Sequence, residues 1–219
     1  MGYSEEKLKS RLRKSNLKAY NGKLLLGYDN SFWVKFWTGK WGDEVISELG
    51  VDLSSMNILD VGCATGRLLS SLAHAGAQNL AGTDVAVKIV EQAGKNLEKT
   101  GITADLRVSD AEDKLPWGES VFTAVTMTGV LHHFFSPLRA LSEVYRILKQ
   151  GGKLIIIEPL FFIPLKQTVN LYLRFFSHEG DCRFYSPSEV IELTKSSGFT
   201  GCRYRKFTFH SFMLSCLKG

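Results

Sequence analysis

The chain has 219 residues, of which 44% are hydrophobic and 22% charged, and its formal net charge is +5. This length accommodates one α/β domain with added segments and is too short for two ordinary domains to be expected. The basic excess lies at the ends: residues 1–48 hold nine Lys and Arg against six Asp and Glu, and residues 159–219 hold eight against four. Such an excess attracts nucleic acid, anionic lipid or an acidic substrate, or it is only a solvated surface.

The N-terminus and the cysteines favour a cytoplasmic protein. The first residues are polar and charged, and the longest apolar run, residues 159–165, is far shorter than the ~20 residues that a membrane span requires. The four cysteines show no C-x-x-C spacing, and a chain of this length does not need disulfides for stability. We therefore expect a reducing cytoplasm and no transmembrane segment.

The N-terminal segment, residues 1–48, is interpreted as a helical cap. Residues 4–20 place leucines among lysines and arginines, which predicts a basic, weakly amphipathic helix. Trp33, Trp37 and Trp41 then recur every four residues and form one apolar face if this part is helical. Such a stripe usually packs in a core, but here it precedes the α/β pattern, so it is also a candidate roof for a pocket.

From residue 57 onward, short apolar runs alternate with helical patterns. Strands separated by helices of this length pair in parallel through right-handed crossovers. In open sheets of this kind, ligands bind beyond the carboxyl ends of the strands. The predicted strands are residues 57–61, 79–84, 103–108, 121–127 and 153–157, and the predicted helices are residues 66–75, 86–99 and 136–149.

The C-terminal third interrupts this alternation. Residues 159–186 combine helical spacing with many Phe and Tyr residues, and we interpret them as an inserted cap. Ser186 and Glu189 then form a capping box for a helix that ends near Gly198. Two last runs, residues 203–207 and 208–217, have little room between them and predict antiparallel strands. We thus predict a cap segment at residues 1–48 and one domain at residues 49–219 that carries the insertion.

The turn after the first strand has the features of a ligand-binding loop. Gly62 and Gly66 let a ligand approach the backbone, and the following helix presents its N–H groups; a purely structural turn is the alternative. Asp84 ends the second strand, where an acid accepts hydrogen bonds from ribose hydroxyls or caps the next helix. The loop is G-x-x-x-G rather than G-x-G-x-x-G, and Asp60 would repel a pyrophosphate. A ligand with a cationic amine and a sulfonium fits better.

Taken together, six motifs resemble the class I S-adenosylmethionine-dependent methyltransferases, in particular their small-molecule branch, the methyltransferase type 11-like proteins. The resemblance covers residues 53–159. Each motif alone is moderate evidence, whereas their order and spacing are specific. The motifs are LDVGCATG at 59–66, GTD at 82–84, SDAE at 109–112, LPW at 115–117, GVLHH at 129–133 and LKQGG at 148–152.

The resemblance implies the fold, the cofactor and the residues that bind it. The implied fold is a Rossmann-like, mainly parallel seven-stranded sheet with helices on both faces and an antiparallel last strand. The implied cofactor is S-adenosylmethionine, with S-adenosylhomocysteine as the product. The residues that the resemblance assigns to the cofactor are Asp60, Gly62, Cys63, Ala64, Thr65, Gly66, Asp84, Val85, Asp110, Ala111, Glu112, Thr128, Gly129 and His132. The alternative for Asp110 is an ordinary turn acid.

Methyl transfer displaces an already activated sulfonium, so positioning and the exclusion of water supply much of the catalysis and a base is optional. His133 and Glu158 are weak candidates for a base, and His132 has a structural or cofactor-side role as its alternative. No acidic cluster indicates a magnesium site, so no metal is expected. The Asn/Asp-Pro-Pro-Tyr turn of amino-directed nucleic-acid enzymes is replaced by TMTG at residues 126–129.

These observations predict an enzyme that methylates a small, partly apolar or lipid-like acceptor under a cap formed by residues 1–48 and 159–186. Two alternatives stay open. One is a non-catalytic partner or regulatory protein that binds S-adenosylmethionine, and the other is an RNA or protein methyltransferase guided by the basic ends. We do not expect a nucleic-acid partner, whereas contact with a membrane surface and the oligomeric state are left open.

Overall fold

The computed structural model describes residues 10, 11, 14, 17, 18, 22, 36, 38–50, 52–176 and 181–219. The predicted basic helix at residues 4–20 lies largely outside these residues, as do Trp33 and Trp37. The elements are α4 (Trp41–Leu49), β1 (Asn57–Val61), α5 (Arg67–His74), β2 (Asn79–Asp84), α6 (Val87–Glu98), β3 (Asp105–Val108), β4 (Phe122–Thr128), the 3-10 helix η2 (Leu131–His133), α7 (Pro137–Ile147), β5 (Leu148–Pro159), α8 (Ile163–Phe176), α9 (Pro187–Ser196), β6 (Phe199–Lys206) and β7 (Ser211–Lys218).

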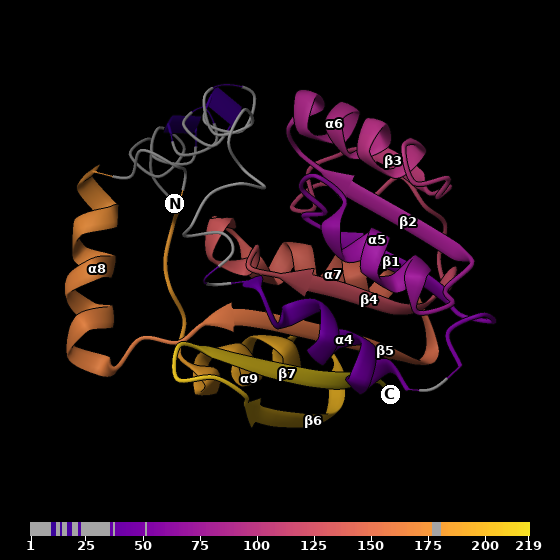
Figure 1. Ribbon diagram of the computed structural model, residues 1–219. Coiled ribbons are helices and arrows are strands. Elements are labelled where there is room, and N and C mark those ends of the chain that lie inside the picture. Colours follow the sequence, from indigo (N-terminus) through magenta and orange to yellow (C-terminus); the bar gives the residue numbers. More distant parts are fainter. Residues whose placement is uncertain are drawn as a thin grey trace.

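One seven-stranded sheet organises the molecule, with the strand order β3-β2-β1-β4-β5-β7-β6. The pairs from β3 through β5 are parallel, and β7 runs antiparallel to both β5 and β6. Figure 1 shows the resulting twisted sheet with helices in front of it and behind it. The predicted Rossmann-like sheet with a reversed last strand is confirmed. Because the crossovers leave β1 and β4 in opposite directions, a crevice forms at their carboxyl ends.

Alternating side chains along β5 show how the two faces of the sheet are covered. Ile155 and Ile157 are fully buried in a cluster with residues of α4 and α5, whereas Leu154 and Ile156 are buried on the other face with residues of α7 and α9. Strands buried on both faces are typical of parallel sheets between helical layers. Because α4 packs in this shared core, the predicted boundary between residues 48 and 49 falls within a helix of the main domain.

Some element boundaries differ from the sequence prediction. Helix α7 ends at Ile147 rather than at residue 149, and β5 begins at Leu148, which is fully buried and pairs with Phe122 of β4. Burial of Leu148 against the sheet outweighs its helical preference. At the C-terminus, β6 begins at Phe199 and β7 at Ser211, so a turn occupies residues where a strand was predicted.

A disulfide joins Cys202 of β6 to Cys216 of β7, with Cα atoms 4.1 Å apart. The sequence pattern did not predict this bond, because only the antiparallel pairing of the two strands brings these cysteines together. The sequence analysis expected no need for a disulfide, and this bond adds a covalent link between two strands that already pair. Cys63 and Cys182 are thiols, and Cys182 Sγ donates to the His133 carbonyl at 3.2 Å.

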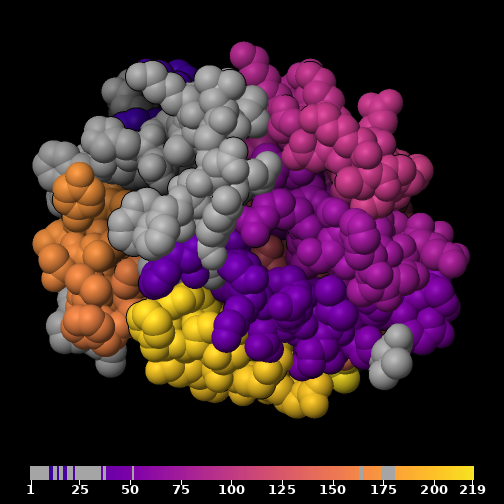
Figure 2. Space-filling view, in the orientation of Figure 1, coloured from indigo at the N-terminus to yellow at the C-terminus, as the bar shows by residue number. Residues whose placement is uncertain are grey.

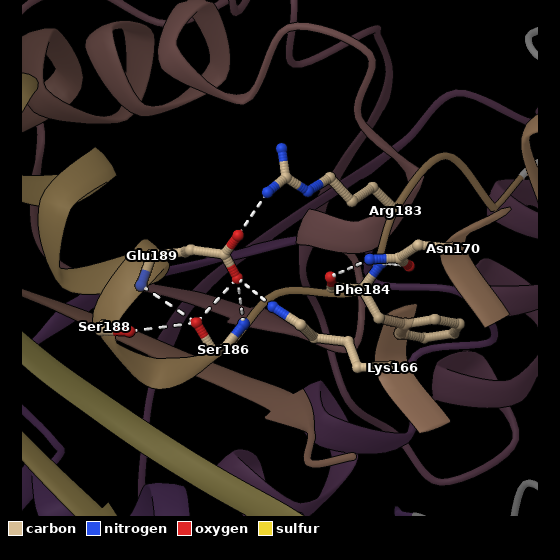
Figure 3. Close-up of polar contacts among 7 residues, drawn as sticks. All are labelled: Lys166, Asn170, Arg183, Phe184, Ser186, Ser188 and Glu189. Carbon is tan, nitrogen blue, oxygen red and sulfur yellow. Dashed lines mark hydrogen bonds and ion pairs between the residues drawn. The ribbon is translucent and has the colours of Figure 1, made fainter. Parts of the chain in front are cut away.

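Helix α8 stands apart from the layers that cover the sheet, beside the end of β5 (Figure 1), and polar contacts fasten it to the segment before α9. Asn170 accepts a hydrogen bond from the Phe184 amide at 2.8 Å and donates to the Phe184 carbonyl at 2.9 Å. Lys166 pairs with Glu189 at 2.6 Å, and Arg183 pairs with the same carboxylate (Figure 3). Partial burial raises the pKa of Glu189, but hydrogen bonds from Lys166 and Ser186 outweigh it and lower the pKa to about 2.

The predicted capping box at the start of α9 is confirmed: the Ser186 side chain accepts from the Glu189 amide, and the Glu189 carboxylate accepts from the Ser186 amide. Of the helices within the described part of the chain, none has both the length and the apolar character needed to cross a bilayer.

Candidate functional site

The glycine-containing loop, residues 62–66, lies at the carboxyl ends of β1 and β2. The amides of Gly62 and Cys63 donate to the Thr83 carbonyl at 2.8 and 3.0 Å, which fixes the loop against β2. Gly62 has φ 75°, and a Cβ atom there would lie 2.5 Å from a Val130 methyl. Both the left-handed backbone and this close approach require glycine at position 62.

Asp60 lies at the base of this loop and is 1% exposed. Its carboxylate accepts a hydrogen bond from the Thr126 hydroxyl at 2.7 Å. Desolvation is the main reason why the pKa of Asp60 is raised to about 7; the Thr126 bond opposes this shift, and the charge of Asp84 adds to it. A group with this pKa gains or loses its charge near neutral pH. A cation bound in the loop would favour the ionised form of the Asp60 carboxyl group.

A cavity of about 290 Å³ opens between this loop and α4. Trp41 forms one wall: its indole N–H donates to the Ser211 hydroxyl at 3.1 Å, and a Cβ atom on Gly129 would lie 2.6 Å from its ring. Figure 2 shows the indigo α4 segment against the purple segment that contains α5, the two walls of the cavity. The lining residues are Thr38, Gly39, Trp41, Gly42, Asp43, Asp60, Gly62, Cys63, Ala64, Thr65, Arg67, Leu68, Ser70, Ser71 and Thr128.

Some residues of this lining were predicted from the sequence, and others were not. The predicted residues Asp60, Gly62 and Thr128 do share one cavity. Thr38 and Asp43 were missed, because they precede the α/β pattern and carry no motif. The aromatic stripe was the available signal, since Trp41 belongs both to the core and to the cavity wall.

Asp84 braces the loop from the end of β2. Its carboxylate accepts hydrogen bonds from the amides of Ala64 at 3.3 Å and Ala86 at 3.1 Å. Burial raises the pKa of Asp84, and bonds from the backbone, including the amide of the predicted cofactor residue Val85, partly oppose the shift. Helix α6 has Ala86 as its N-cap and no side-chain cap hydrogen bond, so the contact of Asp84 with the Ala86 amide is not the N-cap that the sequence left as an alternative. The bonds from the Ala64 and Ala86 amides fix the orientation of the carboxylate, which does not itself line the cavity.

Two acidic side chains of the motif after β3, Asp110 and Glu112, accept backbone hydrogen bonds that fix this turn. Asp110 accepts a hydrogen bond from the Glu112 amide at 2.9 Å, which is the turn geometry named above as its alternative. The Glu112 carboxylate accepts from the amides of Phe135 and Ser136 at the start of α7, and Ala111 is buried. Glu112 therefore connects this turn to α7, and the binding of the cofactor by Asp110 and Ala111 stays a prediction.

A polar cluster follows β4. His132 donates from Nδ1 to Glu158 at 2.6 Å, and the second Glu158 oxygen accepts from the Leu131 amide at 2.8 Å. His133 Nδ1 lies 3.0 Å from an oxygen of Asp181. Burial would lower the pKa of His132, but the charge and hydrogen bond of Glu158 outweigh it, so the pKa is raised.

These contacts refine the two candidates for a base. Glu158 is 0% exposed and both of its oxygens are bonded, so it orients His132 and does not face an acceptor. The carboxylate partners of the two histidines could not be predicted from the sequence. Asp181 belongs to no recognised motif, because it lies in the insertion. The geometry thus joins predicted residues from two strand ends with one acid that sequence reasoning missed.

One protein family and several individual proteins are similar to this chain in sequence. Residues 59–156 match the family described as "Methyltransferase domain". The ubiquinone/menaquinone biosynthesis C-methyltransferase UbiE of Desulfotalea psychrophila is 26% identical over 191 residues, covering 77% of this chain and 75% of that protein. The ubiquinone biosynthesis O-methyltransferase of Xanthomonas oryzae pv. oryzae is 36% identical over 104 residues, covering 48% of this chain and 43% of that protein. The chain thus spans less than half the length of that O-methyltransferase.

Among solved structures, a SAM-dependent methyltransferase from Aquifex aeolicus superposes with a TM-score of 0.68 at 20% sequence identity. The match covers 96% of this chain and 98% of that chain. At this identity the similarity shows the fold alone.

Proposed function

Since the chain is a class I S-adenosylmethionine-dependent methyltransferase, we propose that it transfers the methyl group to a hydroxyl of a small phenolic acceptor with an apolar tail. The observation that carries the proposal is the cluster after β4: histidines oriented by a buried carboxylate, next to aromatic side chains, at the cofactor end of the sheet. We also propose that residues 1–48 and the insertion at residues 159–186 form a cap over the acceptor.

The residues of the crevice fit the cofactor. The loop at Gly62 has no room for a side chain, the buried Asp60 would hold a cationic amine, and Asp84 would accept hydrogen bonds from two ribose hydroxyls. Gly129 and Thr128 would lie under the reactive end. When bound, S-adenosylmethionine supplies a methyl group on a sulfonium, and S-adenosylhomocysteine is the expected product.

Aromatic rings beside the cluster support a ring-shaped acceptor. Phe184 stacks on the imidazole of His132, with centroids 4.8 Å apart and planes 28° apart, and Phe161 lies 4.8 Å from Phe184. Flat, apolar walls bind a phenol ring, while the imidazoles and Asp181 bind its polar edge. Two relatives are named for ubiquinone biosynthesis, one as a C-methyltransferase and one as an O-methyltransferase; these names support a quinone-related acceptor class, and the second supports a hydroxyl as the acceptor group.

The chain's own residues contribute positioning and proton removal. A phenol hydroxyl must lose its proton as the oxygen forms its bond to the methyl carbon, and the sulfur keeps the electron pair of the bond that breaks. His132, His133 and Asp181 are the groups placed to receive that polar edge. Burial of the cluster keeps water from competing with the phenol oxygen.

Labelled cofactor tests this function. The full chain is incubated with methyl-labelled S-adenosylmethionine and a panel of phenols, catechols and quinols with and without an apolar tail, and products are identified by mass spectrometry. We expect a methyl ether on a tailed phenol, with the untailed phenol a poorer substrate. Cofactor binding without labelling of any member, or labelling only of RNA or protein, would replace the proposal by one of the two alternatives given above.

A further inference from the structure

His132, His133 and Asp181 form the only group of three within the described residues whose ligand atoms could share one metal ion. These atoms all lie within 4.8 Å of one another. Asp181 Oδ1 is 3.0 Å from His133 Nδ1 and 3.8 Å from His132 Nε2. Ligand atoms around a tetrahedral Zn²⁺ lie about 3.3 Å apart, given bonds of 2.0–2.1 Å. Small side-chain rotations therefore bring the three atoms to coordination distance.

Glu158 sets the histidine tautomer that metal binding requires. In the neutral form of His132, donation from Nδ1 to Glu158 at 2.6 Å leaves the lone pair on Nε2, on the side of Asp181, where a bound cation would displace the second proton. Glu158 is itself fixed, since it is fully buried and its other oxygen accepts from the Leu131 amide. A carboxylate that accepts the second N–H of a ligating histidine is the usual outer-shell partner in metal sites.

Backbone contacts hold Asp181 in place against the histidines. The amides of Cys182 and Arg183 both donate to the His132 carbonyl, at 2.8 and 3.1 Å. One residue further, the Phe184 backbone is bonded on both sides by Asn170 (Figure 3). Asp181 thus reaches the histidines through a fixed segment rather than through a flexible surface contact.

We propose that His132, His133 and Asp181 bind one divalent transition-metal ion, best matched by Zn²⁺, with an open position for the acceptor hydroxyl. Two imidazole nitrogens and one carboxylate oxygen are the donor set of catalytic zinc sites, which keep their fourth position open. The side chains of the three residues are 9%, 12% and 19% exposed, so the ion is partly shielded from water.

The role of the ion in the reaction rests on the proposed function, whereas its binding does not. A phenol oxygen bound to the ion loses its proton to water at a lower pH than the free phenol does. The resulting phenolate oxygen then forms the bond to the methyl carbon, and the sulfur retains the electron pair of the broken bond. This places the charge on the acceptor without a histidine that must act as a base.

Direct metal binding tests the site. The purified full chain is freed of metal with a chelator and dialysed, then titrated with Zn²⁺ by calorimetry and with Co²⁺ by visible absorption. We expect one ion per chain and the absorption bands of four-coordinate Co²⁺. We expect Asp181→Asn and His133→Gln each to weaken binding more than tenfold, and Glu158→Gln to weaken it about 10- to 100-fold by releasing the His132 tautomer.

Matched controls separate the cluster from other donors. Asp113→Asn and His74→Gln change an exposed acid and an exposed histidine elsewhere and should leave binding unchanged. Cys182→Ser should also retain binding, since the assigned ligands contain no sulfur. Circular dichroism melting of each variant shows that it is folded.

No uptake by the wild-type chain, equal affinity in Asp181→Asn, or loss of binding in Cys182→Ser or His74→Gln would overturn the assignment. Zinc binding without phenol methylation would leave the site standing and remove the proposed function. Methylation that continues undiminished in the metal-free chain would remove the ion from the reaction.

Discussion

Replacing Asp60 by asparagine measures two effects separately: how burial of this acid lowers folding stability, and how the acid contributes to ligand affinity. Desolvation, together with the charge of Asp84 and against the Thr126 bond, raises the pKa of Asp60 from 3.8 to about 7. Between these two values the folded chain binds more protons than the unfolded chain, so stability falls as pH rises from about 4 to about 7. Three pKa units at 1.36 kcal/mol each give a loss of about 4 kcal/mol.

The Asp60→Asn variant lacks this ionisation. Its amide keeps an oxygen that can accept from Thr126 but buries an N–H₂ donor, which costs about 1–3 kcal/mol independently of pH. We therefore expect the unfolding free energy of the variant, relative to wild type, to rise by about 3 kcal/mol between pH 4.5 and pH 8, since part of the wild-type loss already occurs below pH 4.5. Urea denaturation at several pH values measures this difference. An unchanged difference between the two pH values would refute the raised pKa and the burial argument behind it.

The affinity of the wild-type chain for S-adenosylhomocysteine should rise with pH over the range in which its stability falls. Below pH 7 the amine of the ligand must displace a proton from Asp60, so the wild-type affinity should rise by up to tenfold per pH unit toward pH 7. The titration of the ligand's own α-amino group is the same in both proteins, so comparison with the variant corrects for it. Calorimetry in buffers of different ionisation enthalpy should detect proton release with wild type alone. Equal pH profiles would place the amine elsewhere.

Three further changes probe other parts of the structure. Asp84→Ala should weaken cofactor affinity by about 1–3 kcal/mol, measured by calorimetry, because a partly buried acceptor is lost; unchanged affinity would refute the ribose assignment. Gly129→Ala should lower the free energy of unfolding, measured in urea, by about 2–4 kcal/mol, because φ at this position is 65° and the Trp41 ring lies where the new methyl group would be. No loss of stability would mean that Trp41 moves aside freely. Asn170→Ala should lower unfolding free energy by about 1–3 kcal/mol and speed amide exchange at Phe184; unchanged exchange would show that α8 does not hold this segment.

The sheet was predictable because its signals are local. Apolar runs of strand length, ended by Asp60, Asp84 and Thr128, alternate with helical spacing, and parallel pairing brings those ends to one edge. Boundaries were less certain where burial competes with local preference, as at Leu148.

The contacts that complete the site could not be predicted. Asp181 meets His133 only because the fold returns the insertion to β4, and Trp41 reaches Gly129 from a segment before the first strand. The bond between Cys202 and Cys216 likewise depends on strand pairing. Such long-range pairs leave no periodic pattern in a single sequence.

Calorimetric titration of the full chain with S-adenosylhomocysteine and, separately, with NAD tests most directly that the crevice of Asp60 and Asp84 is a methyl-donor site. We expect one molecule of S-adenosylhomocysteine per chain, with affinity lowered in Asp84→Ala, and no measurable heat with NAD. Binding of NAD in place of S-adenosylhomocysteine would contradict the account.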